Sequence, residues 1–227
     1  GEVCSGQWGS AVNTLPARSL PVVGSDEIFQ VSNFSVVQGS RELVQEVSLS
    51  LHVGEVLAIT GANGVGKSSL LHALAAKAPS QSICRLVPEN VSSLFITETL
   101  EEELSRADSL AGHKHSGLTA MTFWSILATE ESPELLSVHP RDLSAGTQVA
   151  LAIALQLAWK PQVILIDEPT RGLDAVSREA MAEVLRCVAE TGTAVLFASH
   201  DEAFVSDLGC RVLAIREGAL VPDEVTA

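Results

Sequence analysis

The sequence predicts an α/β fold with a mostly parallel central sheet, and three observations support this prediction. An apolar run at residues 56–59 leads into a glycine-rich segment, after which a helical pattern of leucines begins. A second apolar run, at residues 163–166, ends in the carboxylates Asp167 and Glu168. Strand-like and helix-like segments alternate along the chain, as they do in sheets whose parallel strands are connected by helices.

The glycine-rich segment has the pattern G-x-x-x-x-G-K-[ST] of a phosphate-binding loop, placed between a strand and a helix as this motif requires. Its glycines let successive backbone N–H groups point at a phosphate, and the following helix adds its positive N-terminal end. We expect Lys67 to reach the β- and γ-phosphates and Ser68 to hold Mg²⁺. The predicted nucleotide-binding residues are Gly61, Ala62, Asn63, Gly64, Val65, Gly66, Lys67, Ser68 and Ser69.

The segment before this loop predicts an antiparallel β subdomain. Residues 1–25 are rich in Ser, Gly and Pro and lack periodicity, which is typical of a linker. The chain starts at Gly1 and not at Met, so we expect a fragment of a longer protein. Residues 28–34 and 47–53 alternate apolar and polar side chains around a turn at Gly39-Ser40, which predicts two paired strands.

The elements after the loop follow from apolar runs, breakers and caps. We predict helices at residues 67–77, from Thr97 onward, at 118–130, from 144 to 159, and at 176–190. We predict strands at residues 56–60, 83–87, 163–168, 194–198 and 212–215. Thr97 is the expected N-cap of its helix, whose first turn contains Glu101–Glu103. In the helix at 118–130, we expect Met121, Phe123, Trp124 and Leu127 to pack in the core.

Composition limits the classes of function. The 227 residues include 28 acidic and 14 basic side chains, a formal net charge of −14, so we expect no nucleic-acid partner. The four cysteines are scattered without a C-x-x-C pair and are interpreted as reduced thiols. His113 and His115 form an H-x-H pair without a third ligand nearby, so a solvated loop is expected there. No run approaches the ~20 apolar residues of a membrane helix.

The two carboxylates after the second apolar run complete the predicted site. Asp167 is expected to hold Mg²⁺ through water. Glu168, one residue later, points to the other side of the strand, where it can accept a proton from water attacking the γ-phosphate.

Together these motifs resemble the ATP-binding-cassette (ABC) ATPases over about residues 26–220. The segment Leu143-Ser144-Ala145-Gly146-Thr147 stands where that family has its L-S-G-G-Q signature, 24 residues before Asp167. Asp174 matches the D-loop aspartate, and His200 matches the switch histidine. The resemblance implies an ABC ATPase domain at residues 26–222, with a helical subdomain at about 90–145 and a tail at 223–227.

The resemblance also implies a mechanism and partners. Two such domains, identical or different and possibly fused in one parent chain, close head to tail on two ATP molecules. Each triphosphate then lies between one domain's phosphate loop and the other's signature residues, Leu143, Ser144, Ala145, Gly146 and Thr147. Ser144 caps a helix whose N-terminus is suited to an anion, in agreement with this role.

Within the family, three stretches are similar to the ATPase subunits of energy-coupling-factor importers for vitamins and metal ions. They are residues 94–104, 143–146 and 167–174. A transmembrane subunit is the implied second partner, with the ATPase at the cytoplasmic face of the membrane.

Three positions depart from the family pattern. Glu89 stands where the Q-loop glutamine contacts Mg²⁺ and the attacking water, so it is a candidate for both roles. Gln38 stands where an aromatic side chain stacks on adenine. The signature departs at Ala145 and Thr147, and Gln148 and Ala150 replace common basic residues.

These departures leave two alternatives to a transport ATPase. One is a regulatory half that binds ATP with weak or no turnover, which Glu89 and Gln38 favour. The other is an ABC ATPase outside transport. Ser144 lies 77 positions after Lys67, which leaves no room for the long coiled coils of DNA-repair members.

Overall fold

The computed structural model of this chain describes residues 20–21, 23–80, 83–114 and 116–223. These residues form two compact units, which are described separately. The sheet unit comprises the described residues of 19–89, 161–171 and 185–227, and the helical unit comprises those of 90–160 and 172–184. The predicted linker and tail lie largely outside the described residues.

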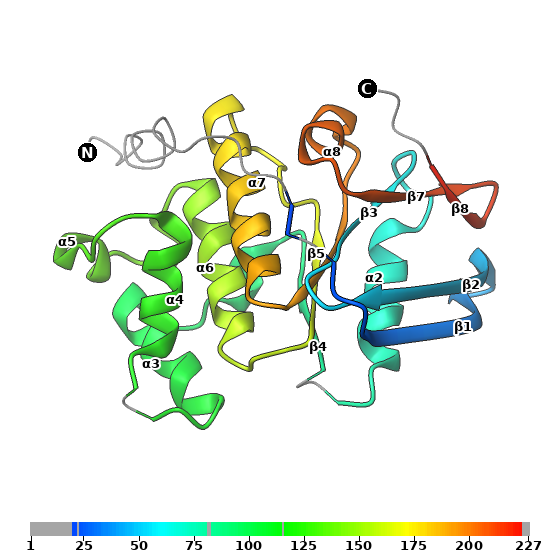
Figure 1. Cartoon of the computed structure of the whole chain (residues 1–227). Helices are drawn as coiled ribbons and strands as arrows, with labels where there is room; N and C mark the ends of the chain where they lie inside the picture. The colour runs from blue at the N-terminus through cyan, green and yellow to red at the C-terminus, as the bar shows by residue number, and fades with distance from the viewer. Residues whose placement is uncertain (1–19, 22, 81–82, 115, 224–227) are drawn as a thin grey trace. The chain divides into compact units, whose positions relative to one another are not determined.

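The sheet unit contains eight strands in one sheet within the described residues (Figure 1). Their order across the sheet is β1-β2-β8-β7-β3-β6-β5-β4. The bounds are β1 Glu27–Gln38, β2 Arg41–His52, β3 Val56–Thr60, β4 Cys84–Val87, β5 Val163–Asp167, β6 Ala194–Ala198, β7 Arg211–Arg216 and β8 Ala219–Pro222.

The strand pairings in this sheet confirm the predicted combination of mostly parallel strands with an antiparallel pair. The strands β7, β3, β6, β5 and β4 pair in parallel. The hairpin β1–β2 is antiparallel. Strand β1 extends beyond the predicted segment 28–34 at both ends, and β2 begins before the predicted segment 47–53 but ends at His52. Because the parallel strands run the same way, their carboxyl ends meet at one edge, where the phosphate loop follows β3, Asp167 ends β5 and Ser199 follows β6.

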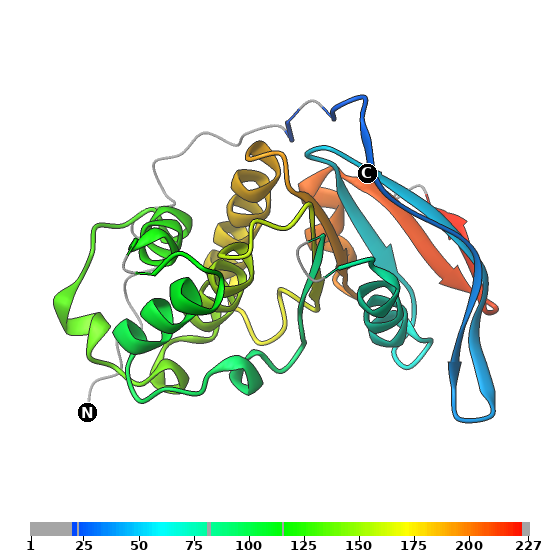
Figure 2. The same cartoon turned by 90° about the horizontal axis from the view of Figure 1, so that it is seen from below.

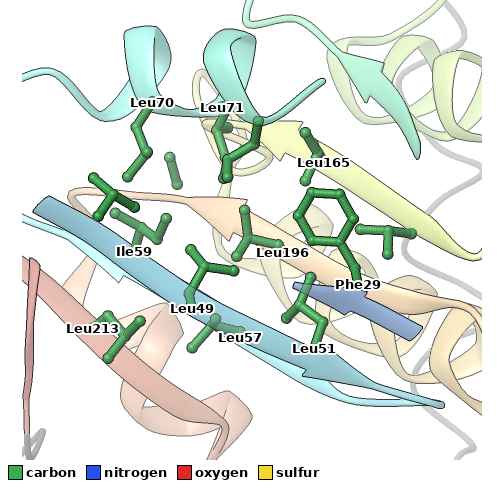
Figure 3. Packing of buried hydrophobic residues seen from close by; sticks show 14 of the residues in the cluster. Phe29, Leu49, Leu51, Leu57, Ile59, Leu70, Leu71, Leu165, Leu196 and Leu213 are labelled. Carbon is green, nitrogen blue, oxygen red and sulfur yellow. The ribbon is translucent and has the colours of Figure 1, made fainter. Parts of the chain in front are cut away.

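Helices cover both faces of the parallel strands. Helix α2, Lys67–Lys77, places Leu70, Leu71 and Leu74 at 0% exposure against alternate residues of the strands, such as Leu196 of β6 (Figure 3). The next residue of β6, Phe197, points to the opposite face. There its ring lies 5.7 Å from that of Phe204 in helix α8, Glu202–Leu208. Strands β3, β5 and β6 are buried along their whole length, and burial on both faces explains why their residues are mostly apolar.

The helical unit contains α3 Leu100–Leu110, α4 Leu118–Leu127, α5 Pro133–Leu136 and α6 Ala145–Leu157, with 3₁₀ turns η1 Val91–Leu94 and η2 Pro140–Asp142 (Figures 1 and 2). Helix α7, Ala175–Glu190, belongs to this unit up to Val184. Helix α4 packs on α3 and α6. Phe123 and Trp124 are buried as expected, but Met121 is 66% exposed, so its predicted core position was wrong.

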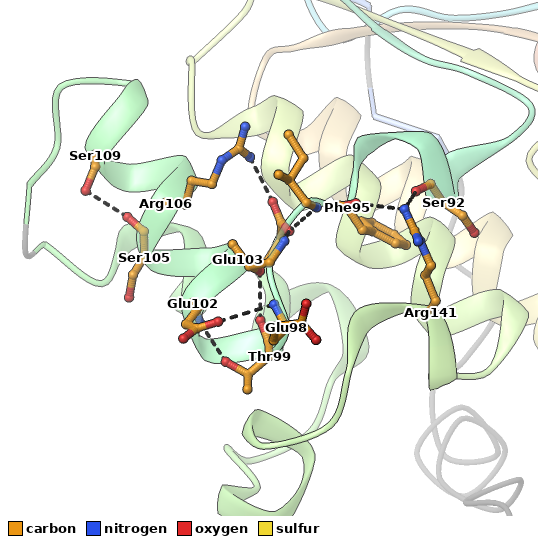
Figure 4. Close-up of polar contacts among 12 residues, drawn as sticks. Ser92, Phe95, Glu98, Thr99, Glu102, Glu103, Ser105, Arg106, Ser109 and Arg141 are labelled. Atoms are coloured by element: carbon orange, nitrogen blue, oxygen red, sulfur yellow. Dashed lines mark hydrogen bonds and ion pairs between the residues drawn. The ribbon is translucent and has the colours of Figure 1, made fainter.

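The prediction that Thr97 caps helix α3 was also wrong. Thr99 is the N-cap, and its hydroxyl accepts a hydrogen bond from the N–H of Glu102 at 3.2 Å (Figure 4). The Thr97 hydroxyl instead donates to Glu103 Oε2 at 2.9 Å. Glu103 is fully buried and also accepts the N–H groups of Ile96 and Thr97. This buried carboxylate therefore fixes the loop and moves the helix start two residues onward.

Within the part of the chain that the structure describes, no helix is long and apolar enough to cross a membrane. The same residues contain no group of three or more His, Cys, Asp or Glu side chains suited to a metal ion. Of the H-x-H pair, His113 lies after α3 as expected, and His115 is outside the described residues.

Candidate functional site

The phosphate loop connects β3 to α2 and depends on two glycines for its shape. Gly61 and Gly66 have φ angles of 140° and 114°, a region that side chains disfavour. A Cβ at Gly61 would lie 3.0 Å from the carbonyl oxygen of Ile215, and one at Gly66 would lie 3.1 Å from Cβ of Leu43. The loop is therefore packed tightly from outside while α2 starts at Lys67 and directs its first N–H groups into the loop.

Lys67 is buried inside this loop. Its Nζ donates hydrogen bonds to the carbonyl oxygens of Gly61 at 2.9 Å and Ala62 at 3.3 Å. It also lies 3.7 Å from Oε1 of Glu168. Loop carbonyls and a carboxylate thus hold the ammonium group at the mouth of the loop, where a phosphate would meet it.

Asp167, the last residue of β5, lies beside Ser68 at the start of α2. Burial and the neighbouring Glu168 raise the pKa of Asp167, although a hydrogen bond with the Ser68 side chain acts in the opposite direction. Its Oδ1 is buried and has no hydrogen-bond partner among the described residues. A hydroxyl beside an unsatisfied carboxylate oxygen is a hard-oxygen donor set that fits Mg²⁺.

Glu168 follows β5 with a φ of 51°, a left-handed conformation that is uncommon for a residue other than glycine. Such strain is often found at functional sites. Its Oε2 lies 2.8 Å from Nδ1 of His200 and accepts the backbone N–H of His200 at 3.4 Å. Because a carboxylate can only accept, Nδ1 of His200 carries the proton, and Nε2 is left for another partner.

Glu89 follows β4, and its carboxylate forms an ion pair with Arg171, which follows β5. The pairing results from the sheet order, since β4 and β5 are parallel neighbours whose carboxyl ends meet. Sequence reasoning missed Arg171. The sequence does show a carboxylate after one predicted strand and an arginine shortly after another. Their contact could not be predicted without knowing that these two strands are neighbours in the sheet.

Most of these side chains line one cavity of about 510 Å³ in the sheet unit, but Asp167 is not part of its lining. It is lined by Gln38, Leu43, Asn63, Gly64, Gly66, Lys67, Ser68, Ser69, Glu89, Glu168, Arg171 and His200. The structure therefore brings together the loop, Glu168, His200, Glu89 and Gln38. The volume and the mixture of loop N–H groups, cations and carboxylates suit a bound polyphosphate.

A family model described as ABC transporter matches residues 44–171, more than half of the chain. The chain belongs to the ABC transporter family. A putative ABC transporter ATP-binding protein of Streptomyces avermitilis is 33% identical over 94% of this chain and 40% of its own length. A putative HMP/thiamine import ATP-binding protein, YkoD of Bacillus subtilis, is 30% identical over 87% of this chain and 39% of its own length. The chain thus spans less than half the length of these relatives.

Two solved ABC structures share the fold. The first is CbiO1 of Clostridium perfringens, described as part of the ABC transporter complex CbiONQ. It matches with a TM-score of 0.72 and 22% identity over 87% of this chain and 88% of its own. The second is the ATP-binding cassette MJ0796, described as a dimer in a post-hydrolysis state bound to ADP and Pi. It matches with a TM-score of 0.67 and 21% identity over 86% of this chain and 97% of its own. The predicted ABC fold is therefore confirmed.

Residues 143–147, which are predicted to be the signature, lie in the helical unit at the start of α6. Ser144 is the N-cap, and its hydroxyl accepts the N–H of Thr147 at 3.3 Å and contacts the Thr147 hydroxyl at 2.8 Å. Gln148 donates to the carbonyl oxygens of Arg141 and Leu143. The side chains that depart from the family pattern thus order the segment before α6, and the N–H groups of Ala145 and Gly146 begin the helix.

Asp174 lies just before α7. Its Oδ1 accepts the N–H of Ser177 at 2.8 Å, and this hydrogen bonding lowers its pKa. Asp174, the predicted D-loop residue, therefore fixes the start of α7 through Ser177.

Proposed function

We propose that this ABC domain binds Mg·ATP in the 510 Å³ cavity and hydrolyses it to power import across a membrane. The observation that carries the proposal is the position of the Glu168 carboxylate between Lys67 Nζ and His200 Nδ1. A base, a buried cation and a histidine converge where the phosphate loop ends. This arrangement supports transfer of the γ-phosphoryl group to water.

Each residue has a role in this proposal. The loop from Gly61 to Ser69 binds the triphosphate through its N–H groups, and Lys67 turns from its carbonyl partners to the β- and γ-phosphates. Glu168 accepts the proton of the attacking water, and His200 holds the carboxylate through Nδ1 while its Nε2 faces the γ-phosphate. Ser68 and Asp167 would hold Mg²⁺, with Glu89 nearby, and the ion would neutralise phosphate charge.

The proposed role in import is supported by the proteins to which this chain is similar and by the residues of the proposed nucleotide site. YkoD is named as an import ATP-binding protein, and CbiO1 is described as part of a transporter complex. We therefore infer two partners for residues 26–222. One is a second ABC domain that completes each site with its residues 143–147 and 174. The other is a transmembrane subunit at the cytoplasmic face of the membrane.

One observation favours a second candidate, an ATP-binding half with weak turnover. The Glu89 carboxylate, in the position of the Q-loop glutamine, is engaged by Arg171. A side chain held in this way is less available to orient water. Under this alternative, ATP would close the domain pair with little hydrolysis.

Calorimetry of Mg·ATP binding to the 227-residue chain tests the first step. Lys67→Ala should weaken binding roughly 100-fold, because charge-assisted hydrogen bonds contribute about 1.5–3 kcal/mol each. Lys114→Ala, which removes an exposed lysine of the helical unit, is the matched control and should bind normally. Equal affinity for the parent chain and Lys67→Ala would refute the site.

A further inference from the structure

The contact between Glu89 and Arg171 occurs inside the lining of the proposed nucleotide cavity. Both side chains line it together with Lys67 and Glu168. The Glu89 side chain is 39% exposed and the Arg171 side chain is 63% exposed. An exposed ion pair adds little to folding stability, so stability does not explain why these charges are held together here.

The charges of the side chains that line the cavity indicate a role for this ion pair in nucleotide binding. Among the described lining residues, Lys67 and Arg171 are positive and Glu89 and Glu168 are negative, so the lining is neutral when His200 is neutral. Without Arg171, the same lining would carry one net negative charge. A triphosphate would then meet an uncompensated carboxylate at Glu89.

The turn after β5 fixes where Arg171 can act. The backbone N–H of Arg171 donates to the carbonyl oxygen of Glu168 at 3.1 Å. Arg171 therefore follows the catalytic carboxylate in one short turn, and its side chain reaches Glu89 on the neighbouring strand end. The guanidinium group is permanently charged, so this compensation persists at any physiological pH.

We infer that Arg171 is a positioning residue for ATP that acts through Glu89. By binding the Glu89 carboxylate, it neutralises that charge and keeps it from opposing the triphosphate. This role makes a glutamate at this position compatible with nucleotide binding. The inference rests on the proposed function, and it assigns Arg171 no direct contact with the nucleotide.

A double-mutant cycle with Mg·ATP as the titrant, at low ionic strength, tests the inference. Arg171→Ala should weaken binding about tenfold, which corresponds to about 1.4 kcal/mol. In the Glu89→Gln background, the same change should weaken binding less than about threefold, because the charge to be compensated is gone. Arg171→Lys keeps the charge and should restore most of the affinity.

The matched control is Arg216→Ala, which breaks an exposed ion pair with Asp223 in the same unit, outside the cavity lining. It removes the same net charge and should leave ATP affinity unchanged. Raising the salt concentration should reduce the Arg171→Ala deficit, as expected for screened charges. A structural role for Arg171 would not be rescued by removing the charge of Glu89.

Three results would overturn the inference. Arg171→Ala could weaken binding equally in both backgrounds, which would mean that Arg171 contacts the nucleotide directly. Arg171→Ala could also leave binding unchanged. Finally, the control Arg216→Ala could weaken binding as much as Arg171→Ala does. If the parent chain binds Mg·ATP and Lys67→Ala does not, any of these results rejects the role of Arg171 alone. If neither binds, the proposed function itself fails.

Discussion

His200 Nδ1 lies 2.8 Å from Glu168 Oε2, although 32 residues separate these two side chains in the sequence. Parallel pairing of β5 with β6 creates this proximity, because Asp167 is the register partner of Ala198. The histidine therefore orients the carboxylate. The same hydrogen bond leaves only one carboxylate oxygen, 3.7 Å from Lys67 Nζ, for a further partner.

We expect Glu168→Gln to lower ATP turnover by about 10²–10⁴-fold, because the amide keeps the size of the side chain but cannot accept a proton. ATP binding should survive, since Lys67 and the loop are unchanged. The measurement is phosphate release by the domain assembled with its partner, with Asp201→Asn, at the N-cap of α8, as the control. Undiminished turnover by the Gln variant would show that Glu168 is not the base.

The parts of this site that could be predicted from sequence are those fixed by local pattern. Helix Lys67–Lys77 and the strands Val56–Thr60 and Ala194–Ala198 occur as predicted, because glycines or capping residues bound clear apolar runs. The start of α3 could not be predicted, since Thr97 and Thr99 both fit an N-cap. Buried Glu103 decides between them.

Contacts between segments that are far apart in the chain could not be predicted from the sequence. The pair of Glu89 and Arg171 depends on β4 lying beside β5, an order that no local pattern encodes. From the sequence alone, the charged neighbours expected for Glu89 are the metal ion, the triphosphate and the carboxylates Asp167 and Glu168. The structure adds the cation Arg171 to these neighbours.

Base selectivity is expected to be weak. Gln38, the last residue of β1, is exposed and lines the cavity where the family has a stacking aromatic side chain. A stacked aromatic typically contributes about 1–3 kcal/mol per base in nucleic-acid-binding proteins. GTP should therefore compete within roughly tenfold of ATP, or about 1.4 kcal/mol.

The matched variant is Gln38→Tyr, which should tighten binding of both nucleotides by about tenfold in competition titrations. Gln45→Tyr, on β2 and outside the cavity lining, is the control. A hundredfold preference of the parent chain for ATP over GTP would mean that another group reads the base.

The start of α3 carries an acidic surface that is a candidate for docking basic segments of a membrane subunit. Glu98, Glu101 and Glu102 are exposed, whereas Glu103 is buried, paired with Arg106 and not part of this surface. Reversing Glu101 and Glu102 to Lys should weaken assembly in a salt-dependent way and leave ATP binding intact.

The control for this reversal is the pair Glu130 and Glu131, which are exposed elsewhere in the helical unit. Changing both to Lys alters the net charge equally and should not affect co-purification with the membrane subunit. The docking role would be rejected if the variant reversed at 101 and 102 assembled as fully as this control.

The last prediction concerns stability and a buried carboxylate between β2 and β3. Glu55 is 5% exposed, and its Oε1 accepts a hydrogen bond from Arg211 Nη1 at 2.9 Å. Its Oε2 accepts the backbone N–H of His52 at 2.9 Å and lies 3.0 Å from His52 Nδ1. Burial alone would raise the pKa of Glu55, but these hydrogen bonds outweigh it and lower the pKa.

A lowered pKa in the folded state means that the unfolded state binds the proton more readily. The contribution of Glu55 to the free energy of unfolding is therefore complete above the ordinary glutamate pKa of about 4.3. It is lost as the pH falls through the lower pKa of the folded state. Glu55→Gln should thus lower the free energy of unfolding by about 1–3 kcal/mol at pH 7, because it leaves buried partners poorly paired.

Urea unfolding of the parent chain and of Glu55→Gln at pH 7, 5 and 3 is the measurement. The difference between the two should be similar at pH 7 and 5 and should shrink at pH 3, where protonation removes the advantage of the carboxylate. Glu42→Gln, an exposed position on β2, should show no such change. A difference that stayed constant down to pH 3 would mean that packing, and not the charge of Glu55, stabilises this corner of the sheet.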